Sequence, residues 1–179
     1  MKNESTAITQ RREHHGTTWP CFNIDSQAEY SWKKKLMLCI WWDQLGVVYY
    51  ELLKPNETII VVLYRTQLMR LSRALKKKRA HYYFRHDKLI LLHDNARPYV
   101  VAPVKTYLET LKWEVLLHPP YSPNIAPSDY HLFRSMTHGL SEQHFISYED
   151  TKNCIDDWIA SKDEAFFRRI STCQKNGKK

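Results

Sequence analysis

Two apolar runs separated by a short polar turn form the first regular pattern in the chain. The runs cover residues 36–42 and 47–53, and residues 43–46 between them end in glycine. Apolar runs of this length around a glycine-containing turn are typical of an antiparallel β-hairpin. Pro55 and Asn56 then end the second predicted strand.

Helical and strand patterns alternate along the rest of the chain. Apolar residues at positions 64, 68, 71 and 75 recur at helical spacing and predict an amphipathic helix. The later elements are a strand over 88–93, a helix over 100–111, a strand over 113–118, a helix from Asp129 and a helix over 148–169. This order predicts an α/β fold in which helices flank a mixed sheet.

The flanks of this pattern differ from its centre. Residues 1–32 are polar and aperiodic, so we interpret them as a poorly ordered arm. The predicted domain covers residues 33–170, and residues 171–179 form a basic tail. A chain of 179 residues is long enough for one domain of this kind.

The charge balance indicates a polyanionic partner. The chain has 27 Lys and Arg residues against 19 Asp and Glu, a net charge of +8. Such a surplus attracts nucleic acid, because each phosphate contact releases condensed counterions. An ordinary basic protein is the alternative that composition leaves open. The 43% hydrophobic content excludes a chain that is disordered throughout.

A basic run closes the predicted helix after position 75. It consists of Lys76, Lys77, Lys78 and Arg79. The favoured interpretation is a solvated helix end that complements the helix dipole. Phosphate binding or nuclear import is the alternative.

Cysteine spacing and hydropathy exclude other classes. The four cysteines lack the spacing of a zinc site, and the first thirty residues lack the apolar segment of a signal peptide. The longest apolar run is far too short to span a bilayer. We therefore expect reduced thiols in an intracellular protein with no membrane partner.

Two aspartates occupy positions suited to chemistry. Asp94 follows a predicted buried strand, and Asp129 lies at a predicted helix start after a proline-rich loop. Carboxylates that converge at a sheet edge repel unless a cation lies between them, and their oxygens suit Mg²⁺ or Mn²⁺. From topology alone, a turn aspartate and a helix-start aspartate remain the favoured interpretation.

Two long motifs favour the metal-binding interpretation of these aspartates instead. His-Asp-Asn-Ala-Arg-Pro at 93–98 and His-Pro-Pro-Tyr-Ser-Pro-Asn-Ile-Ala-Pro-Ser-Asp-Tyr-His-Leu-Phe at 118–133 resemble the signature blocks of mariner transposases. The hairpin with its Trp-Trp-Asp sequence is also similar to that family. The resemblance covers about residues 33–169 and is highly specific because the blocks are long.

The resemblance implies a fold, an activity and a set of residues. The fold is an RNase H-like domain, and the activity is metal-dependent DNA cleavage followed by strand transfer into a TA target. Asp94 and Asp129 are implied as ligands of Mg²⁺ or Mn²⁺, whereas Asp43 matches a hairpin-turn position outside the active site. Arg97 is the candidate for phosphate contact. DNA, a homodimer and a nuclear location are expected.

The sequence also departs from the family pattern. The Gly-Asp-Glu-Lys-Trp motif that carries the first catalytic aspartate is absent, so we expect a sheet without its first strand and a chain inactive alone. Apolar residues at 60–62 replace a polar helix start, which removes a cap worth about 1 kcal/mol. The helix-turn-helix modules that read transposon ends are missing as well. The alternative function is a non-catalytic DNA-binding or protein-interaction module derived from a transposase.

Overall fold

The computed structural model describes seven stretches of the chain: residues 7–11, 36–54, 57–80, 89–93, 100–117, 127–140 and 147–176. The strands are β1 Ala7–Arg11, β2 Leu38–Asp43, β3 Gly46–Leu52, β4 Ile90–His93 and β5 Glu114–Leu117. The helices are α1 Val61–Lys78, α4 Ala102–Thr110, α5 Pro127–Leu140, α6 Tyr148–Ala160 and α7 Glu164–Asn176. Asp94, Arg97 and the proline-rich loop 118–126 lie outside these stretches.

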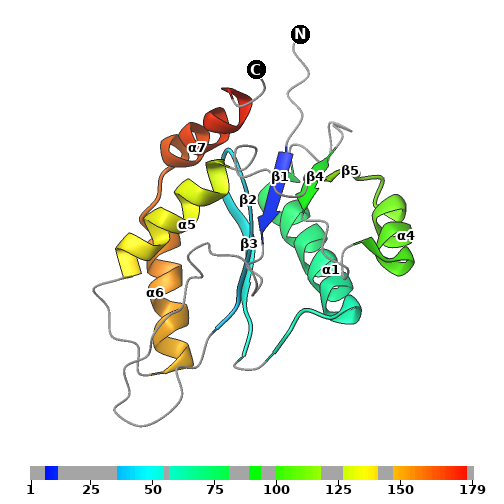
Figure 1. Ribbon diagram of the computed structural model, residues 1–179, viewed down its shortest axis with the longest axis horizontal. Helices are drawn as coiled ribbons and strands as arrows, with labels where there is room; N and C mark the ends of the chain where they lie inside the picture. The colour runs from blue at the N-terminus through cyan, green and yellow to red at the C-terminus, as the bar shows by residue number, and fades with distance from the viewer. Residues whose placement is uncertain are drawn as a thin grey trace.

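The strands form one mixed sheet in the order β3-β2-β1-β4-β5 (Figure 1). The β2–β3 hairpin and the β1–β2 pair are antiparallel, whereas β4 is parallel to both β1 and β5. The strands and helices predicted from residue 36 onward are present with boundaries shifted by a few residues, except that the last predicted helix is divided in two. The predicted α/β fold with a mixed sheet is therefore confirmed.

The predicted absence of the first strand is wrong. Residues Ala7–Arg11 form β1, which lies between β2 and β4 at the centre of the sheet. Thr9 is the register partner of Trp42 on one side and of Leu92 on the other. The segment looked like part of a polar arm because local pattern carries little strand signal there. Hydrogen bonding to β2 and β4 along both edges stabilises this strand, although its local sequence has little strand propensity.

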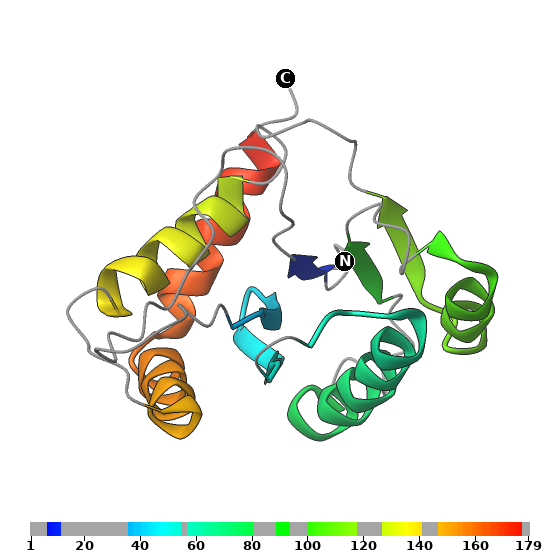
Figure 2. The ribbon, with the colours of Figure 1, turned by 60° about the horizontal axis from the view of Figure 1, so that its bottom comes forward.

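Alternating residues of the hairpin build a core on each face of the sheet. Cys39 and Trp41 face α1 and α4, whereas Ile40 and Trp42 face α5, α6 and α7. Figure 2 shows the two groups of helices on opposite sides of the sheet. Successive side chains of a strand point to opposite faces, so a run of apolar residues supplies both cores at once.

The hairpin turn depends on its glycine. Gly46 has a φ of 128°, in the region where a side chain is disfavoured. Asp43 lies at the other end of the turn, and its Oδ1 accepts a hydrogen bond from the backbone N–H of Leu45 at 2.8 Å. The polar residues 43–46 thus close the hairpin as the sequence predicted.

The last predicted helix is two helices. α6 ends at Ala160 and α7 begins at Glu164, so the chain breaks over residues 161–163. The Oδ1 atom of Asp163 accepts a hydrogen bond from the N–H of Phe166 at 2.9 Å, which caps the new helix. α7 continues to Asn176, and most of the predicted basic tail is therefore helical.

Candidate functional site

β4 and β5, the strands that lead into the two signature motifs, end side by side at one edge of the sheet. β4 and β5 run parallel, and their last residues, His93 and Leu117, are register partners. The chain continues from these residues directly into the segments 94–98 and 118–126. Because parallel strands end at the same sheet edge, His93 and Leu117 lie at the edge where α/β folds place their ligands.

The candidate metal ligands are only partly placed. Asp94 lies outside the described residues, as does the phosphate-contact candidate Arg97. Asp129 falls in the first turn of α5, where the backbone is described and the side chain is not. Among the described residues, no group of three His, Cys, Asp or Glu side chains could hold a metal ion. The shared cation therefore stays a prediction.

β1 adds a third strand to the same edge. It runs parallel to β4 and next to it, so their carboxyl ends lie together. The five residues of β1 are Ala-Ile-Thr-Gln-Arg, which include no Asp or Glu. The central strand therefore has no residue of the type that the family resemblance implies for the first catalytic position.

The basic run at the end of α1 has members in different environments. Lys76 and Lys77 are exposed in the last helical turn. The Nζ of Lys78 donates a hydrogen bond to the carbonyl oxygen of Val47 at 3.3 Å, and burial lowers the pKa of this lysine. Lys76 and Lys77 thus form a solvated helix end, whereas Lys78 contacts the hairpin, and contact of the run with DNA stays a prediction.

Arg79, the last member of the basic run, has a specific protein partner. Its Nε and Nη2 atoms donate hydrogen bonds to the two carboxylate oxygens of Asp43, at 2.8 and 3.0 Å. Asp43 is 1% exposed, so Arg79 neutralises a buried charge. This contact agrees with the prediction that Asp43 is a hairpin-turn residue, and its exclusion from the metal site stays a prediction. It gives Arg79 a structural role that the sequence analysis missed, because the sequence does not show that the helix ends at the hairpin turn.

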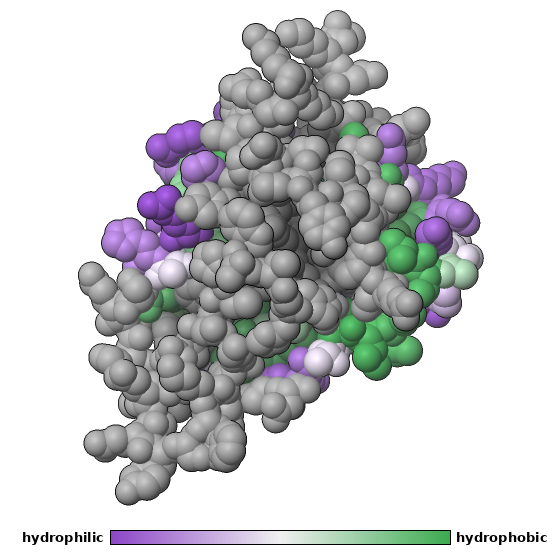
Figure 3. Space-filling model, in the orientation of Figure 1, coloured by the Kyte–Doolittle hydropathy of each residue, from purple (hydrophilic) through white to green (hydrophobic). Residues whose placement is uncertain are grey.

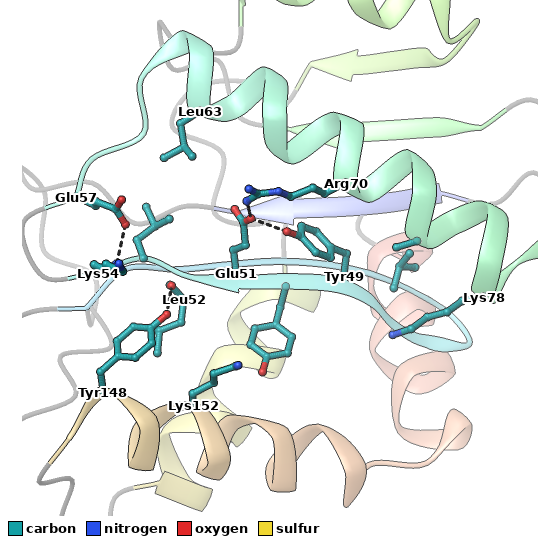
Figure 4. A pocket seen from close by; sticks show the side chains of 14 residues that line it. Tyr49, Glu51, Leu52, Lys54, Glu57, Leu63, Arg70, Lys78, Tyr148 and Lys152 are labelled. Atoms are coloured by element: carbon teal, nitrogen blue, oxygen red, sulfur yellow. Dashed lines mark hydrogen bonds and ion pairs between the residues drawn. The ribbon is translucent and has the colours of Figure 1, made fainter.

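A cluster of hydrogen-bonded polar side chains lies along β3. The carboxylate Oε1 of Glu51 accepts hydrogen bonds from the Tyr49 hydroxyl, at 2.5 Å, and from Arg70 of α1 (Figure 4). Burial and the Glu51 carboxylate raise the pKa of Tyr49 well above its ordinary value. These residues line a groove of about 610 Å³ beside the strand. No sequence pattern marked them, since the cluster depends on how α1 packs across β3.

The described surface combines charged regions with a few exposed apolar side chains. Ile60 and Val62, at the start of α1, are exposed at 59% and 70%. Figure 3 shows apolar side chains at the surface on the side where Figure 1 places α1 and α4. None of the described helices has both the length and the apolar composition that crossing a membrane requires.

The sheet order and its helical layers define the class of protein. A mixed sheet in the order β3-β2-β1-β4-β5, with helices on both faces, is an RNase H-like α/β fold. Residues 24–84 match the family model described as "Transposase (partial DDE domain)". The structure is similar to the Mos1 transposase catalytic domain solved with raltegravir and Mn, with a TM-score of 0.76 and 45% identity. That match covers 97% of this chain and 83% of the other.

Curated relatives point to the same family. The mariner Mos1 transposase of Drosophila mauritiana is 55% identical over 136 residues, covering 76% of this chain and 39% of that protein. The human histone-lysine N-methyltransferase SETMAR is 36% identical over 134 residues, covering 75% of this chain and 19% of that protein. The chain belongs to the mariner transposase family and corresponds to a fragment of the catalytic domain. It spans well under half the length of these relatives.

Proposed function

We propose that this domain derives from a DNA cleavage and strand-transfer enzyme and does not cut DNA by itself. The observation that carries the proposal is the composition of β1. This strand lies beside β4, which leads into the first signature motif, yet it has no carboxylate. Cleavage of the expected kind needs a third carboxylate beside the proposed Asp94 and Asp129, and the residues of β1 do not supply it.

The proposed metal ligands are Asp94 and Asp129. Their carboxylate oxygens are hard donors that suit Mg²⁺ or Mn²⁺, and Mos1 catalytic-domain structures have been solved with each ion. A bound ion would favour ionisation of a water or hydroxyl nucleophile. The remaining chemistry belongs to residues of this chain, with Arg97 as the proposed contact to a phosphate.

DNA is the proposed partner, and a homodimer in the nucleus is the proposed state. The net charge of +8 favours binding to any duplex through its phosphates. Mos1 has been solved as a paired-end complex whose match covers 97% of this chain, with a TM-score of 0.79. The exposed Lys76 and Lys77 support the DNA contact and are consistent with nuclear import.

A nicking assay tests the loss of cleavage. The purified chain is incubated with a mariner-end duplex and Mn²⁺, beside an Asp94→Ala variant as a matched control. We expect no cleavage above background for either protein, because β1 offers no third carboxylate. Mn²⁺-dependent nicking that disappears in Asp94→Ala would show that the domain remains an active nuclease.

The second candidate function is a non-catalytic DNA-binding module, favoured by the basic end of α1. Filter binding across a salt series tests this function, because each lost phosphate contact lowers the slope of log K against log salt by about one. We expect this decrease for Lys77→Ala, and no change for Lys105→Ala, an exposed lysine on α4. We expect an Asp94→Ala, Asp129→Ala double variant to keep the full slope. Equal slopes for both lysine variants would remove the basic run from the DNA-binding surface.

A further inference from the structure

β3 is an edge strand, and a groove runs along it. It lies at the end of the sheet order, and no strand among the described residues pairs with its outer side. The groove of about 610 Å³ follows residues 48–54 and is bounded by side chains from α1 and α6. Figure 4 shows β3 between the two helices, with α1 over one face of the strand and α6 under the other.

The hydrogen-bond pattern identifies the backbone groups that face this groove. The N–H of Leu53 donates to the carbonyl of Met37 at 2.9 Å, so Leu53 points toward the neighbouring strand. Hydrogen-bonded and non-hydrogen-bonded residues alternate along an antiparallel pair. The backbone N–H and C=O of Glu51 therefore also point toward β2, whereas those of Tyr50 and Leu52 point away from it. The Tyr148 hydroxyl donates to the Leu52 carbonyl at 2.6 Å, which agrees with that assignment.

Side chains occupy both ends of this edge, and within the described part of the chain nothing binds the backbone groups at its middle. Tyr148 binds the carbonyl of Leu52 at one end, and Lys78 binds the carbonyl of Val47 at the other. The N–H and C=O of Tyr50 lie between them and face the groove. An unpaired strand edge of this kind pairs readily with another extended chain.

The two walls of the groove differ in chemistry, so they would bind different side chains of an added strand. On the α1 side, the Oε2 atom of Glu51 is buried and meets no hydrogen-bond donor among the described residues. A rotation of the Glu51 side chain toward the groove would let a hydroxyl or an amide from a ligand satisfy it. On the α6 side, Lys152 reaches toward the groove in Figure 4. Cationic groups outnumber carboxylates in the lining by four to two: Lys54, Arg70, Lys78 and Lys152 against Glu51 and Glu57.

We propose that this groove binds an extended acidic segment of a partner protein, which adds to the sheet as a strand beside β3. Alternate side chains of such a strand point to opposite walls. One set would carry hydroxyls to Glu51, and the other would carry carboxylates to Lys152. This inference is independent of the metal site, because it uses the opposite end of the sheet from β5.

A second copy of the chain fits this groove less well. α1 and α6 flank β3 on both sides, so a β3 strand from another molecule would bring its own two helices into the same space. The excess of cationic side chains would also repel an identical edge. An isolated strand with carboxylates meets neither obstacle.

Peptide binding to the full chain tests the proposal. The probe is a fluorescein-labelled peptide of four Thr-Glu repeats, measured by fluorescence polarisation at physiological salt. The first control is the same peptide with alternate backbone nitrogens methylated, which keeps the charges and removes strand pairing. We expect the methylated peptide to bind at least about tenfold more weakly, because two or more backbone hydrogen bonds are lost.

Matched variants separate the groove from general charge attraction. Lys152→Glu reverses one charge in the groove, and Lys105→Glu makes the same change on α4, away from β3. We expect about a tenfold loss of affinity for Lys152→Glu and little change for Lys105→Glu. Equal binding of the two peptides, equal loss in the two variants, or no binding would each overturn the proposal. A chain dimer that the peptide dissociates would also overturn it by assigning the groove to a second copy.

Discussion

Asp43 is a carboxylate removed almost completely from water, and Arg79 is the group that compensates its charge. The pair is bidentate, and the side chain of Arg79 is itself only 15% exposed. Such a pair contributes little net stability over an apolar pair of the same shape. Its importance lies in what happens when one partner is lost, because the remaining charge then has no solvent and no counterion.

Arg79→Met therefore destabilises the domain strongly. The change keeps an unbranched side chain but leaves the Asp43 carboxylate buried and unpaired, which costs about 3–5 kcal/mol. Urea unfolding followed by tryptophan fluorescence measures the difference. The control is Arg168→Met, which breaks an exposed i,i+4 pair with Glu164 and is expected to cost at most about 0.5 kcal/mol. Equal losses would mean that Arg79 does not neutralise a buried charge.

At the scale of elements, the contact between α5 and α6 is a close approach of backbone to an aromatic ring. A Cβ atom built on Gly139 of α5 would lie 2.8 Å from Cδ1 of Trp158 in α6. The indole Nε1 of Trp158 also donates to the Ser135 carbonyl at 3.3 Å, which holds the ring in place. The small residue thus allows the two helices to meet.

Gly139→Ala is expected to destabilise the domain although alanine favours helix. The propensity gain is about 1 kcal/mol, and the overlap with Trp158 costs about 1–3 kcal/mol because its hydrogen bond resists movement. A thermal-melting experiment on Gly139→Ala and on the Gly139→Ala, Trp158→Phe double variant measures the gain in helix propensity and the cost of the overlap. If Gly139→Ala raises the melting temperature, the close approach does not constrain the two helices.

Element boundaries were predictable wherever a local signal existed. The apolar runs gave β2 and β3, and the start of α1 was expected to lack a polar cap. The structure confirms this, since Ile60 is the N-cap residue and its side chain makes no capping hydrogen bond. The break after α6 was missed, because Asp163 is recognisable as a cap only once the preceding helix is known to end.

At the scale of the whole molecule, pairing between distant segments fixes features that the local hydrophobic pattern does not predict. The register of His93 with Leu117 shows that the two strands leading into the signature motifs end side by side, and the metal site expected there stays a prediction. The Arg79–Asp43 pair and the groove beside β3 arise from packing between distant segments. β1 was missed because its place in the sheet comes from pairing on both sides.

A proline in β1 tests whether the sheet depends on this strand. Ile8→Pro removes a backbone N–H in a strand paired along both edges, where proline is almost never found. We expect a loss of at least about 2 kcal/mol in unfolding free energy, because a carbonyl in the adjoining strand loses its donor. The measurement is chemical denaturation monitored by circular dichroism. Unchanged stability would show that β2 and β4 are held in place without β1.

The central place of β1 also sets an order of assembly. The hairpin forms between neighbouring residues, and β4, α4 and β5 follow one another along the chain, so each half-sheet can nucleate locally. Joining the halves requires Ala7 to reach Ile90, which closes a long loop at an entropic cost. The rate-limiting step of refolding is then expected to be the insertion of the amino-terminal strand between two preformed pieces.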